Sequence, residues 1–299
     1  MTHERLTTGV FPAMVTPFTE SGDIDHDALA AEASRLAAAG VDGLVPVGST
    51  GESATLSHEE HVEVVETVVE AVDDVPVIAG SGSNNTREAI DLSAGAEAAG
   101  ADGLLLISPY YNRPEPPGME AHYRAVADAV DLPQILYNVP SRTGRSMAVE
   151  TTAALAKHPN VVGYKAASGD LGLISEVVEH TRGEDFAVIS GDDGLTLPIM
   201  SVGGTGTISV AANVDPDRVI AIVKAAAAGD FEAARTIHHE LGPLLRALFV
   251  ESNPIPVKEA LAIQGRCRPT VRSPLSRLSG DRRSALADVM GDLDLEQPP

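Results

Sequence analysis

Ala38-Ala39-Gly40-Val41-Asp42-Gly43-Leu44 is repeated, with one change, as Ala98-Ala99-Gly100-Ala101-Asp102-Gly103-Leu104, 60 residues further along the chain. In each copy an alanine-rich segment typical of a helix ends at glycine, the chain turns at Asp-Gly, and an apolar segment begins. A spacing of two helix–strand units is the distance expected between strands of equal parity in a barrel.

The alternation of strand and helix extends over most of the chain, with most strands about 26–34 residues apart, the size of one βα unit. Eight consecutive units favour a (β/α)8 TIM barrel of the α/β class over a doubly wound sheet, and no dinucleotide-binding motif follows the first strand. The expected strands are 9–16, 43–47, 76–80, 103–108, 133–139, 161–167, 187–191 and 206–211. The expected helices are 25–39, 57–72, 86–99, 118–130, 149–157, 170–181, 193–202 and 215–228.

The pattern changes after about residue 226. Helical segments at 230–249, 255–264 and 281–291 follow without strands between them, and prolines separate them. We therefore divide the chain into a catalytic barrel, residues 1–225, and a small helical C-terminal extension, residues 226–299. We expect this extension to cover a face of the barrel or to form a subunit contact, and its sequence shows no site of its own.

The chain is strongly acidic, with 43 acidic against 21 basic residues and a formal net charge of -22. This charge argues against nucleic acid and anionic membranes as partners. The acids are dispersed and lysines are few, which favours adaptation to high intracellular salt, because salt screens the repulsion of such a surface. Ordinary acidity is the alternative.

The cysteine count and the hydropathy of the chain limit its expected location and the kinds of site that it can form. Cys267 is the single cysteine, which excludes an intramolecular disulfide and a cysteine-based metal cluster. The first residues, Met1–Arg5, lack the charged-then-apolar pattern of a signal peptide, and no run of about 18 apolar residues occurs. We expect a cytoplasmic protein.

Lysine is rare: the chain has Lys157, Lys165, Lys224 and Lys258 and no others. The segment Val161-Val162-Gly163-Tyr164-Lys165-Ala166-Ala167 places one of them near the end of a buried strand, where a barrel builds its active site. Burial disfavours the ammonium form, so the pKa falls and the amine becomes a nucleophile for carbonyl carbons. The alternative is an edge-strand lysine whose amine reaches water.

The turn after the second expected strand is Gly48-Ser49-Thr50-Gly51-Glu52. Its glycines permit a tight turn, and its hydroxyl and N–H groups form a cradle for a carboxylate or a phosphate. A glycine-rich turn without a ligand is the alternative.

Three of the five tyrosines, Tyr110, Tyr111 and Tyr137, come at the ends of the fourth and fifth expected strands, and Arg142 follows. Tyrosine hydroxyls relay protons, and a guanidinium group binds a carboxylate through two hydrogen bonds. The alternative is that the tyrosines fill the barrel mouth and the arginine lies on the surface.

Metal-dependent aldol chemistry needs several converging His or carboxylate ligands. Asp192 and Asp193 follow the seventh strand, and His58 and His61 lie three apart on an expected helix. A solvated helix face explains the two histidines better, and His238-His239 lie far from the strand ends. The sequence therefore predicts no metal site.

Together these strand-end motifs resemble the dihydrodipicolinate synthase and N-acetylneuraminate lyase family of class I aldolases, over about residues 9–265. The resemblance rests on Gly48–Glu52, on Tyr137-Asn138-Val139-Pro140-Ser141-Arg142-Thr143-Gly144, and on Lys165 in Gly163-Tyr164-Lys165. It implies that Lys165 forms a Schiff base with pyruvate, with no metal or organic cofactor.

The resemblance also implies roles for the other strand-end residues. Tyr137 relays protons with Ser49, which stands where the family often has threonine, and with Tyr111, which is lent across a dimer interface. The residues that bind substrate are Thr50, which holds the pyruvate carboxylate, Arg142, Gly191 and Ile208, whose carbonyl faces the pyruvate.

Arg142 and the Asn253–Lys258 run, Asn-Pro-Ile-Pro-Val-Lys, are similar to the synthase branch, which condenses pyruvate with aspartate semialdehyde. The nearest alternative is an aldolase, such as an N-acetylneuraminate lyase, that cleaves a 2-keto-3-deoxy sugar acid to pyruvate. An alternative from another class is a non-catalytic barrel that senses a keto acid or lysine.

Finally, the resemblance implies a homotetramer built as a dimer of dimers, and a site for feedback inhibition by lysine at the dimer interface. The residues at matching positions are His58, His61, Asn84, Glu88 and Tyr110.

Overall fold

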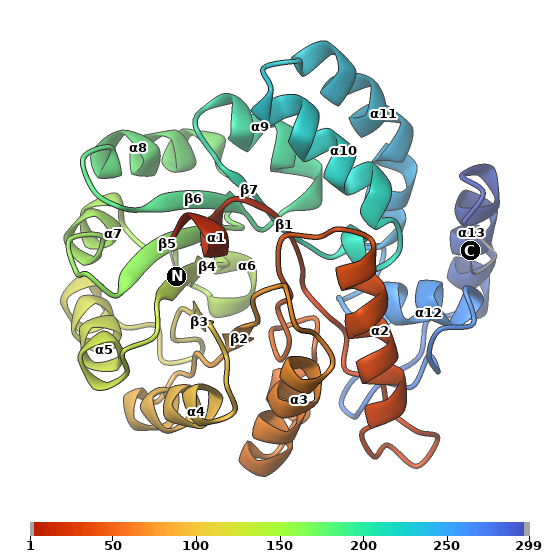
Figure 1. Ribbon diagram of the computed structural model, residues 1–299, viewed down its shortest axis with the longest axis horizontal. Helices are drawn as coiled ribbons and strands as arrows, with labels where there is room; N and C mark the ends of the chain where they lie inside the picture. Colours follow the sequence, from red (N-terminus) through yellow and green to blue (C-terminus); the bar gives the residue numbers. More distant parts are fainter. Residues whose placement is uncertain (1–2, 296–299) are drawn as a thin grey trace.

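The computed structural model describes residues 3–295. Seven parallel strands form one sheet in the order β1-β7-β6-β5-β4-β3-β2, and Figure 1 shows this sheet at the centre of a ring of helices. The strands are β1 (Gly9–Pro12), β2 (Ile78–Gly80), β3 (Gly103–Ile107), β4 (Gln134–Asn138), β5 (Val161–Ala166), β6 (Ala187–Ser190) and β7 (Gly206–Ser209).

The sheet closes through the segment that was expected as strand 43–47. This segment forms two isolated bridges, Ala13↔Val45 and Leu44↔Val77, in place of a regular strand. Val45 N donates to Pro12 O (3.0 Å), and Leu44 N donates to Pro76 O (2.8 Å), so the segment joins both edges of the sheet. The chain leaves the extended conformation at Val47, whose φ is 48°. The closed (β/α)8 barrel is confirmed, but one regular strand is replaced by bridges.

Helices surround the sheet close to the expected positions. Those of the barrel are α2 (His26–Ala38), α3 (His58–Glu70), α4 (Thr86–Ala98), α5 (Pro116–Ala129), α7 (Val149–Leu155), α8 (Leu171–Thr181), α9 (Thr196–Ser201) and α10 (Pro216–Ala227). The expected helix 193–202 is split into a 3-10 turn, η2 (Asp193–Leu195), and α9. The sequence pattern did not predict four short helical pieces, because three or four residues are too few to show a helical period. These are α1 (Glu4–Thr7), α6 (Pro140–Thr143), η1 (Ser53–Thr55) and η3 (Ala211–Asn213).

The repeated sequence pattern has a repeated structural cause. Gly40 and Gly100 end helices α2 and α4 with φ values of 84° and 89°, a region that glycine enters without strain. The aspartate two residues later then binds the neighbouring strand segment. Asp42 Oδ2 accepts from Val10 N (2.8 Å), and Asp102 Oδ2 accepts from Val77 N (2.9 Å). Each copy therefore fixes the register of one βα unit against the preceding one.

Apolar side chains fill two separate spaces. The larger core lies between the sheet and the helices, and it includes Tyr164 and Ala166 of β5. The smaller core fills the barrel interior with aliphatic and aromatic side chains from around the sheet. Its buried members are Leu6, Phe11, Ala13, Val45, Ile78, Leu105, Ile135, Tyr137, Val139, Val162, Ile189 and Ile208.

The C-terminal helices follow the barrel as expected: α11 (Phe231–Ala247), α12 (Ile255–Ile263) and α13 (Gly280–Asp292). Helix α11 packs on α10, and α13 packs on both α11 and α12 (Figure 1). The expected boundary after residue 225 falls inside α10, and the division into two parts stays a prediction.

Helix α12 is tied to the barrel by a buried ion pair. Lys258 Nζ donates to Glu52 Oε1 (2.5 Å) and to Thr270 O (2.8 Å), and the Lys258 side chain is fully buried. Its Nζ also lies over the Phe18 ring, 4.0 Å from the centroid. Of the four lysines, Lys258 and Lys165 are therefore buried, whereas Lys157 and Lys224 are exposed.

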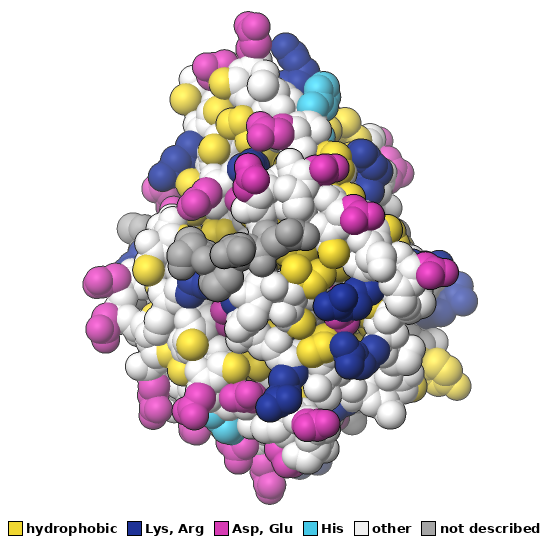
Figure 2. All heavy atoms as spheres, turned by 90° about the vertical axis from the view of Figure 1, so that its right-hand side faces the viewer, with side chains coloured by type: hydrophobic (Ala, Val, Ile, Leu, Met, Phe, Trp, Pro, Cys, Tyr) yellow, Lys and Arg dark blue, Asp and Glu magenta, His cyan; other side chains and the backbone are white. Residues whose placement is uncertain are grey.

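The charged surface is mixed. Figure 2 shows acidic side chains spread over one face of the molecule, with lysine and arginine side chains between them. No helix within residues 3–295 is long and apolar enough to cross a membrane.

We predict that Lys258→Met lowers the free energy of unfolding by about 3–5 kcal/mol, because it leaves the buried Glu52 carboxylate without its counter-charge. Denaturant unfolding at constant salt measures the change. The matched control is Lys224→Met at an exposed position, with an expected change within about 0.5 kcal/mol. Equal effects of the two substitutions would contradict a structural role for the buried pair.

Candidate active site

Lys165 points into the barrel interior because of the alternation along β5. Tyr164 and Ala166 belong to the core between sheet and helices, so the side chain between them lies on the opposite face of the strand. Lys165 is 5% exposed. The amine therefore lies inside the barrel and is shielded from solvent.

Tyr137 on β4 is the direct neighbour of Lys165 in the parallel register. The Lys165 Nζ lies over the Tyr137 ring, 4.3 Å from its centroid. Burial raises the pKa of the Tyr137 hydroxyl, and the charge of Arg142 and the Ser49 hydroxyl oppose this shift. Tyr137 is therefore held as a neutral phenol that can donate or accept a proton beside the amine.

Burial lowers the pKa of Lys165 to about 7. The carboxylate of Asp193 opposes this shift, and the charge of Arg142 adds to it. Asp193 is itself buried, and its Oδ2 accepts from Val210 N (3.0 Å) and Ala211 N (2.9 Å). A large fraction of Lys165 is therefore a neutral amine near pH 7.

Gly191 leaves room for the lysine side chain. A Cβ atom at this position would lie 2.8 Å from both Cγ and Cε of Lys165. The Gly191 N–H donates to Ala166 O (2.7 Å), which fixes the backbone beside the amine. Any larger residue at 191 would displace the lysine.

A cavity of about 540 Å³ opens above Lys165. Its walls come from the ends of several strands and from the chain after α10. The lining residues are Thr50, Tyr137, Val139, Ser141, Arg142, Lys165, Ala167, Gly191, Asp192, Gly194, Val210, Leu245, Arg246, Phe249 and Asn253. Five residues predicted from sequence are thus brought together: Lys165, Tyr137, Thr50, Arg142 and Gly191.

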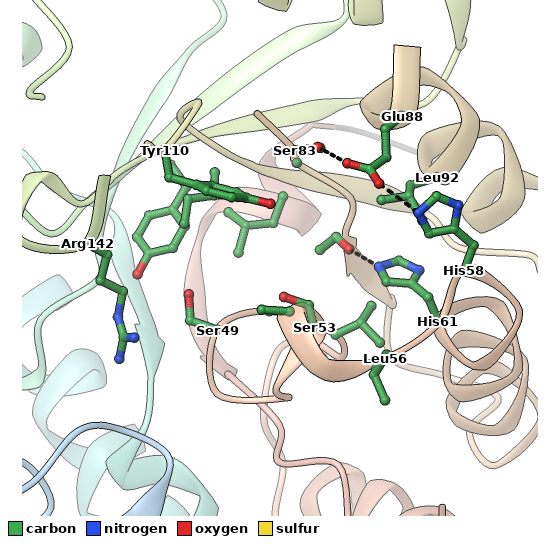
Figure 3. Close-up of a pocket in the computed structure, with 18 of the residues that line it drawn as sticks. Ser49, Ser53, Leu56, His58, His61, Ser83, Glu88, Leu92, Tyr110 and Arg142 are labelled. Atoms are coloured by element: carbon green, nitrogen blue, oxygen red, sulfur yellow. Dashed lines mark hydrogen bonds and ion pairs between the residues drawn. The ribbon is translucent and has the colours of Figure 1, made fainter. Parts of the chain in front are cut away.

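A second cavity, of about 320 Å³, lies beside the first and shares the walls formed by Tyr137 and Arg142. His58, His61, Glu88 and Tyr110 line it, together with Ser49. Figure 3 shows the His58 and Glu88 side chains facing one another on one side of this cavity and Arg142 on the other. The predicted lysine-site residues other than Asn84 are therefore brought together.

Hydrogen bonds fix the polar side of this second cavity. His58 Nε2 pairs with Glu88 Oε1 (2.9 Å), and the Ser83 hydroxyl donates to Glu88 Oε2. Both contacts lower the pKa of Glu88, with Ser83 making the larger contribution. His61 Nε2 donates to Gly80 O (2.6 Å), and burial lowers the pKa of this ring. Glu88 is therefore a carboxylate held at the cavity wall.

Three predicted residues lie outside both cavities. The Tyr111 side chain is 91% exposed, and its φ is 66°, which is uncommon for a tyrosine. Ile208 is buried in the barrel interior beside the strand β1. Asn84 is half-buried, and its carbonyl accepts from Asn112 Nδ2 (2.8 Å).

Residues 6–292 match the model of the Dihydrodipicolinate synthetase family, which covers nearly the whole chain. The chain belongs to this family. Among relatives, 4-hydroxy-tetrahydrodipicolinate synthase of Natronomonas pharaonis is 65% identical over 294 residues, covering 98% of this chain and 100% of the relative. The enzyme of the same name from Haloarcula marismortui is 65% identical over 288 residues, covering 96% of this chain and 94% of the relative.

Solved structures agree. The dihydrodipicolinate synthase of Aquifex aeolicus has a TM-score of 0.94 at 43% identity, covering 97% of this chain and 99% of that chain. The 4-hydroxy-tetrahydrodipicolinate synthase of Methylacidiphilum fumariolicum has a TM-score of 0.93 at 44% identity, covering 96% of each chain. This member of the Dihydrodipicolinate synthetase family therefore shares the fold and most of its length with enzymes named dihydrodipicolinate synthase or 4-hydroxy-tetrahydrodipicolinate synthase.

The structure adds cavity residues that sequence reasoning missed. Leu245, Arg246, Phe249 and Asn253 belong to the C-terminal extension, yet they line the cavity above Lys165. The extension therefore contributes to the site of the barrel, although its sequence shows no site of its own. The signal was the Asn253–Lys258 run, but its sequence does not show that the chain after α11 returns to the barrel mouth.

No group of three His, Cys, Asp or Glu side chains is placed as metal ligands would be, within the described part of the chain.

We predict that labelling of Lys165 by pyruvate and borohydride rises with pH through about 7 and levels off above it. The reason is the sign of the titration: the neutral amine attacks the ketone, and it predominates only above the lowered pKa. Intact-protein mass spectrometry at short labelling times measures the rate, with Lys165→Arg as the unlabelled control. A rate that still climbs steeply between pH 9 and 10 would contradict the lowered pKa.

Proposed function

We propose that this chain is a 4-hydroxy-tetrahydrodipicolinate synthase, a lyase that condenses pyruvate with L-aspartate-4-semialdehyde in lysine and diaminopimelate biosynthesis. The observation that carries the proposal is the single cavity that joins a largely neutral Lys165 amine, the Thr50 hydroxyl and the Arg142 guanidinium. A nucleophile that shares one cavity with two carboxylate-binding groups suits two substrates that each carry a carboxylate.

The reaction starts at Lys165. Its neutral amine attacks C2 of pyruvate, and loss of water from the carbinolamine leaves an iminium, which withdraws electrons from the methyl group. We assign to Tyr137 the passage of protons to and from this adduct, and the 4.3 Å from its ring centroid to Lys165 Nζ supports this role. Loss of a methyl proton gives an enamine, whose carbon attacks the aldehyde carbon of the second substrate.

Ring closure releases the enzyme. The amino nitrogen of the second substrate attacks the iminium carbon and displaces the Lys165 amine, so that a six-membered ring forms and the lysine is regenerated. Each step needs proton transfers through hydroxyl groups and calls for no metal or organic cofactor.

The Tyr137 relay is completed by Ser49 and by Tyr111 of a neighbouring subunit. The exposed Tyr111 side chain and its φ of 66° are the features that support this role, because a large aromatic group is rarely held out in solvent in a strained conformation. Ile208 contributes its carbonyl to the pyruvate site. The homotetramer and the cytoplasmic location stay predictions.

The two alternative functions predict different experimental outcomes. A sugar-acid aldolase would form the same lysine adduct but would not turn over aspartate semialdehyde. A non-catalytic sensing barrel would bind the keto acid without forming an adduct. The lowered pKa of Lys165 favours an enzyme, because a sensor has no use for a neutral amine.

We predict that Arg142→Ala lowers kcat/KM for aspartate semialdehyde by about 10- to 100-fold, the effect of losing a charge-assisted hydrogen-bonded pair, whereas Lys165 still forms the pyruvate adduct that borohydride traps. A coupled condensation assay measures the rate. Arg145→Ala is the matched control, because Arg145 pairs with Glu115 outside both cavities. Unchanged turnover of the semialdehyde in Arg142→Ala would overturn the synthase assignment.

The second cavity is proposed as the lysine-inhibition site, with Glu88 as the acceptor for an ammonium group. The position of the second cavity supports this role, because Tyr137 and Arg142 line both cavities. A ligand in the second cavity would therefore contact residues of the active-site cavity. Asn84 would join the site only with a neighbouring subunit in place.

We predict that Glu88→Ala raises the lysine concentration for half-inhibition at least about tenfold, because a charge-assisted hydrogen bond is lost. Activity against lysine concentration measures it. The control is Glu97→Ala, at the exposed end of the same helix α4. Identical inhibition curves for Glu88→Ala and the wild type would exclude this cavity.

A further inference from the structure

Asn253 contacts two residues that line the active-site cavity, Thr50 and Arg142. Its side-chain Nδ2 donates to the Thr50 hydroxyl oxygen (2.9 Å), and its backbone carbonyl accepts from Arg142 Nη2 (3.0 Å). Asn253 is 7% exposed and belongs to the cavity wall. One residue of the C-terminal extension therefore touches both groups assigned to carboxylate binding.

The direction of the Thr50 contact matters for its chemistry. A hydroxyl group has one hydrogen to donate and two lone pairs to accept with. Because the Thr50 oxygen accepts from Asn253, its hydrogen stays free to be donated into the cavity. A hydroxyl fixed in this way is oriented for an anion before the anion arrives.

The amide oxygen of Asn253 indicates that its Nδ2 donor has a function. Asn253 Oδ1 is buried and has no hydrogen-bond partner among residues 3–295. Leaving a buried acceptor unpaired costs free energy, and such groups in folded proteins call for an explanation. The hydrogen bond that the Asn253 Nδ2 donates to Thr50 accounts for an asparagine at this position.

The surrounding contacts hold Asn253 in place. Lys258, five residues further along the chain, donates to Glu52, which follows Thr50 by two residues. The turn that carries Thr50 and the start of α12 are thus joined at two points, Thr50–Asn253 and Glu52–Lys258. The position of Asn253 relative to Thr50 is set by a buried framework.

We propose that Asn253 is a positioning residue that orients the Thr50 hydroxyl for the pyruvate carboxylate. The proposal rests on the proposed function, in which Thr50 binds that carboxylate. Arg142 binds the backbone carbonyl of Asn253. Side-chain substitutions at 253 therefore remove the hydrogen bond to Thr50 and keep the hydrogen bond from Arg142.

The test compares Asn253→Ala and Asn253→Asp with the wild type. Half-saturation by pyruvate is measured through borohydride labelling of Lys165, and KM for each substrate is measured in the condensation assay. Neither quantity depends on how much of a sample is folded. Asn253→Ala should raise pyruvate half-saturation on the order of tenfold, with KM for the aldehyde substrate within about twofold of the wild type.

Asn253→Asp should be more damaging than Asn253→Ala. A carboxylate only accepts, so it would take the Thr50 hydrogen away from the cavity and would repel the pyruvate carboxylate. In a Thr50→Val background, which has no hydroxyl to orient, Asn253→Ala should change pyruvate half-saturation by less than about twofold.

Three results would overturn the proposal: equal effects of Ala and Asp, parallel changes in the KM values of both substrates, or additive effects with Thr50→Val. The proposed function fails in a different way, because a wild-type enzyme without a pyruvate adduct on Lys165 would remove the activity and this inference together.

Discussion

The cost of burying an ammonium group organises this molecule. Lys165 stands inside a barrel whose interior is filled by aliphatic and aromatic side chains, and this surrounding lowers its pKa to about 7. The neighbouring groups serve the same amine: Gly191 leaves space for its stem, Tyr137 lies against Nζ, and Asp193 limits the shift. The barrel thus converts hydrophobic packing, which stabilises the fold, into the nucleophile that starts the chemistry.

Two buried lysines in one chain have opposite uses. Lys165 has no carboxylate in hydrogen-bond contact within the described residues, so burial shifts its charge state. Lys258 is paired with Glu52 at 2.5 Å, and the Glu52 charge opposes the effect of burial on its pKa. Desolvation acts on both groups, and the presence of a paired carboxylate decides whether the result is a reactive amine or a structural clamp.

Local signals predicted the parts of the fold and site that depend on neighbours in sequence. The Asp-Gly turns at 42 and 102 predicted the βα repeat, and the apolar strand around Lys165 predicted its burial. The same logic predicted a regular strand at 43–47 and missed the early turn at Val47, because a positive φ at valine has no sequence signature. The contact of Asn253 with Thr50 could not be predicted for another reason. The two residues are 203 positions apart in sequence, and no periodic pattern indicates such a contact. The role proposed for Tyr111 involves a second subunit, and in the single chain its side chain is 91% exposed.

The contacts between the turn at 50–52 and the start of α12 also have a consequence for the timing of synthesis. Thr50 and Glu52 leave the ribosome early, but their partners Asn253 and Lys258 follow 203 and 206 residues later. Earlier βα units can form as they emerge, since their contacts are local. The pyruvate pocket cannot be complete until the last fifth of the chain has been made and has folded back. A chain that ends before Asn253 therefore lacks the side chain that contacts Thr50 and one wall of the cavity above Lys165.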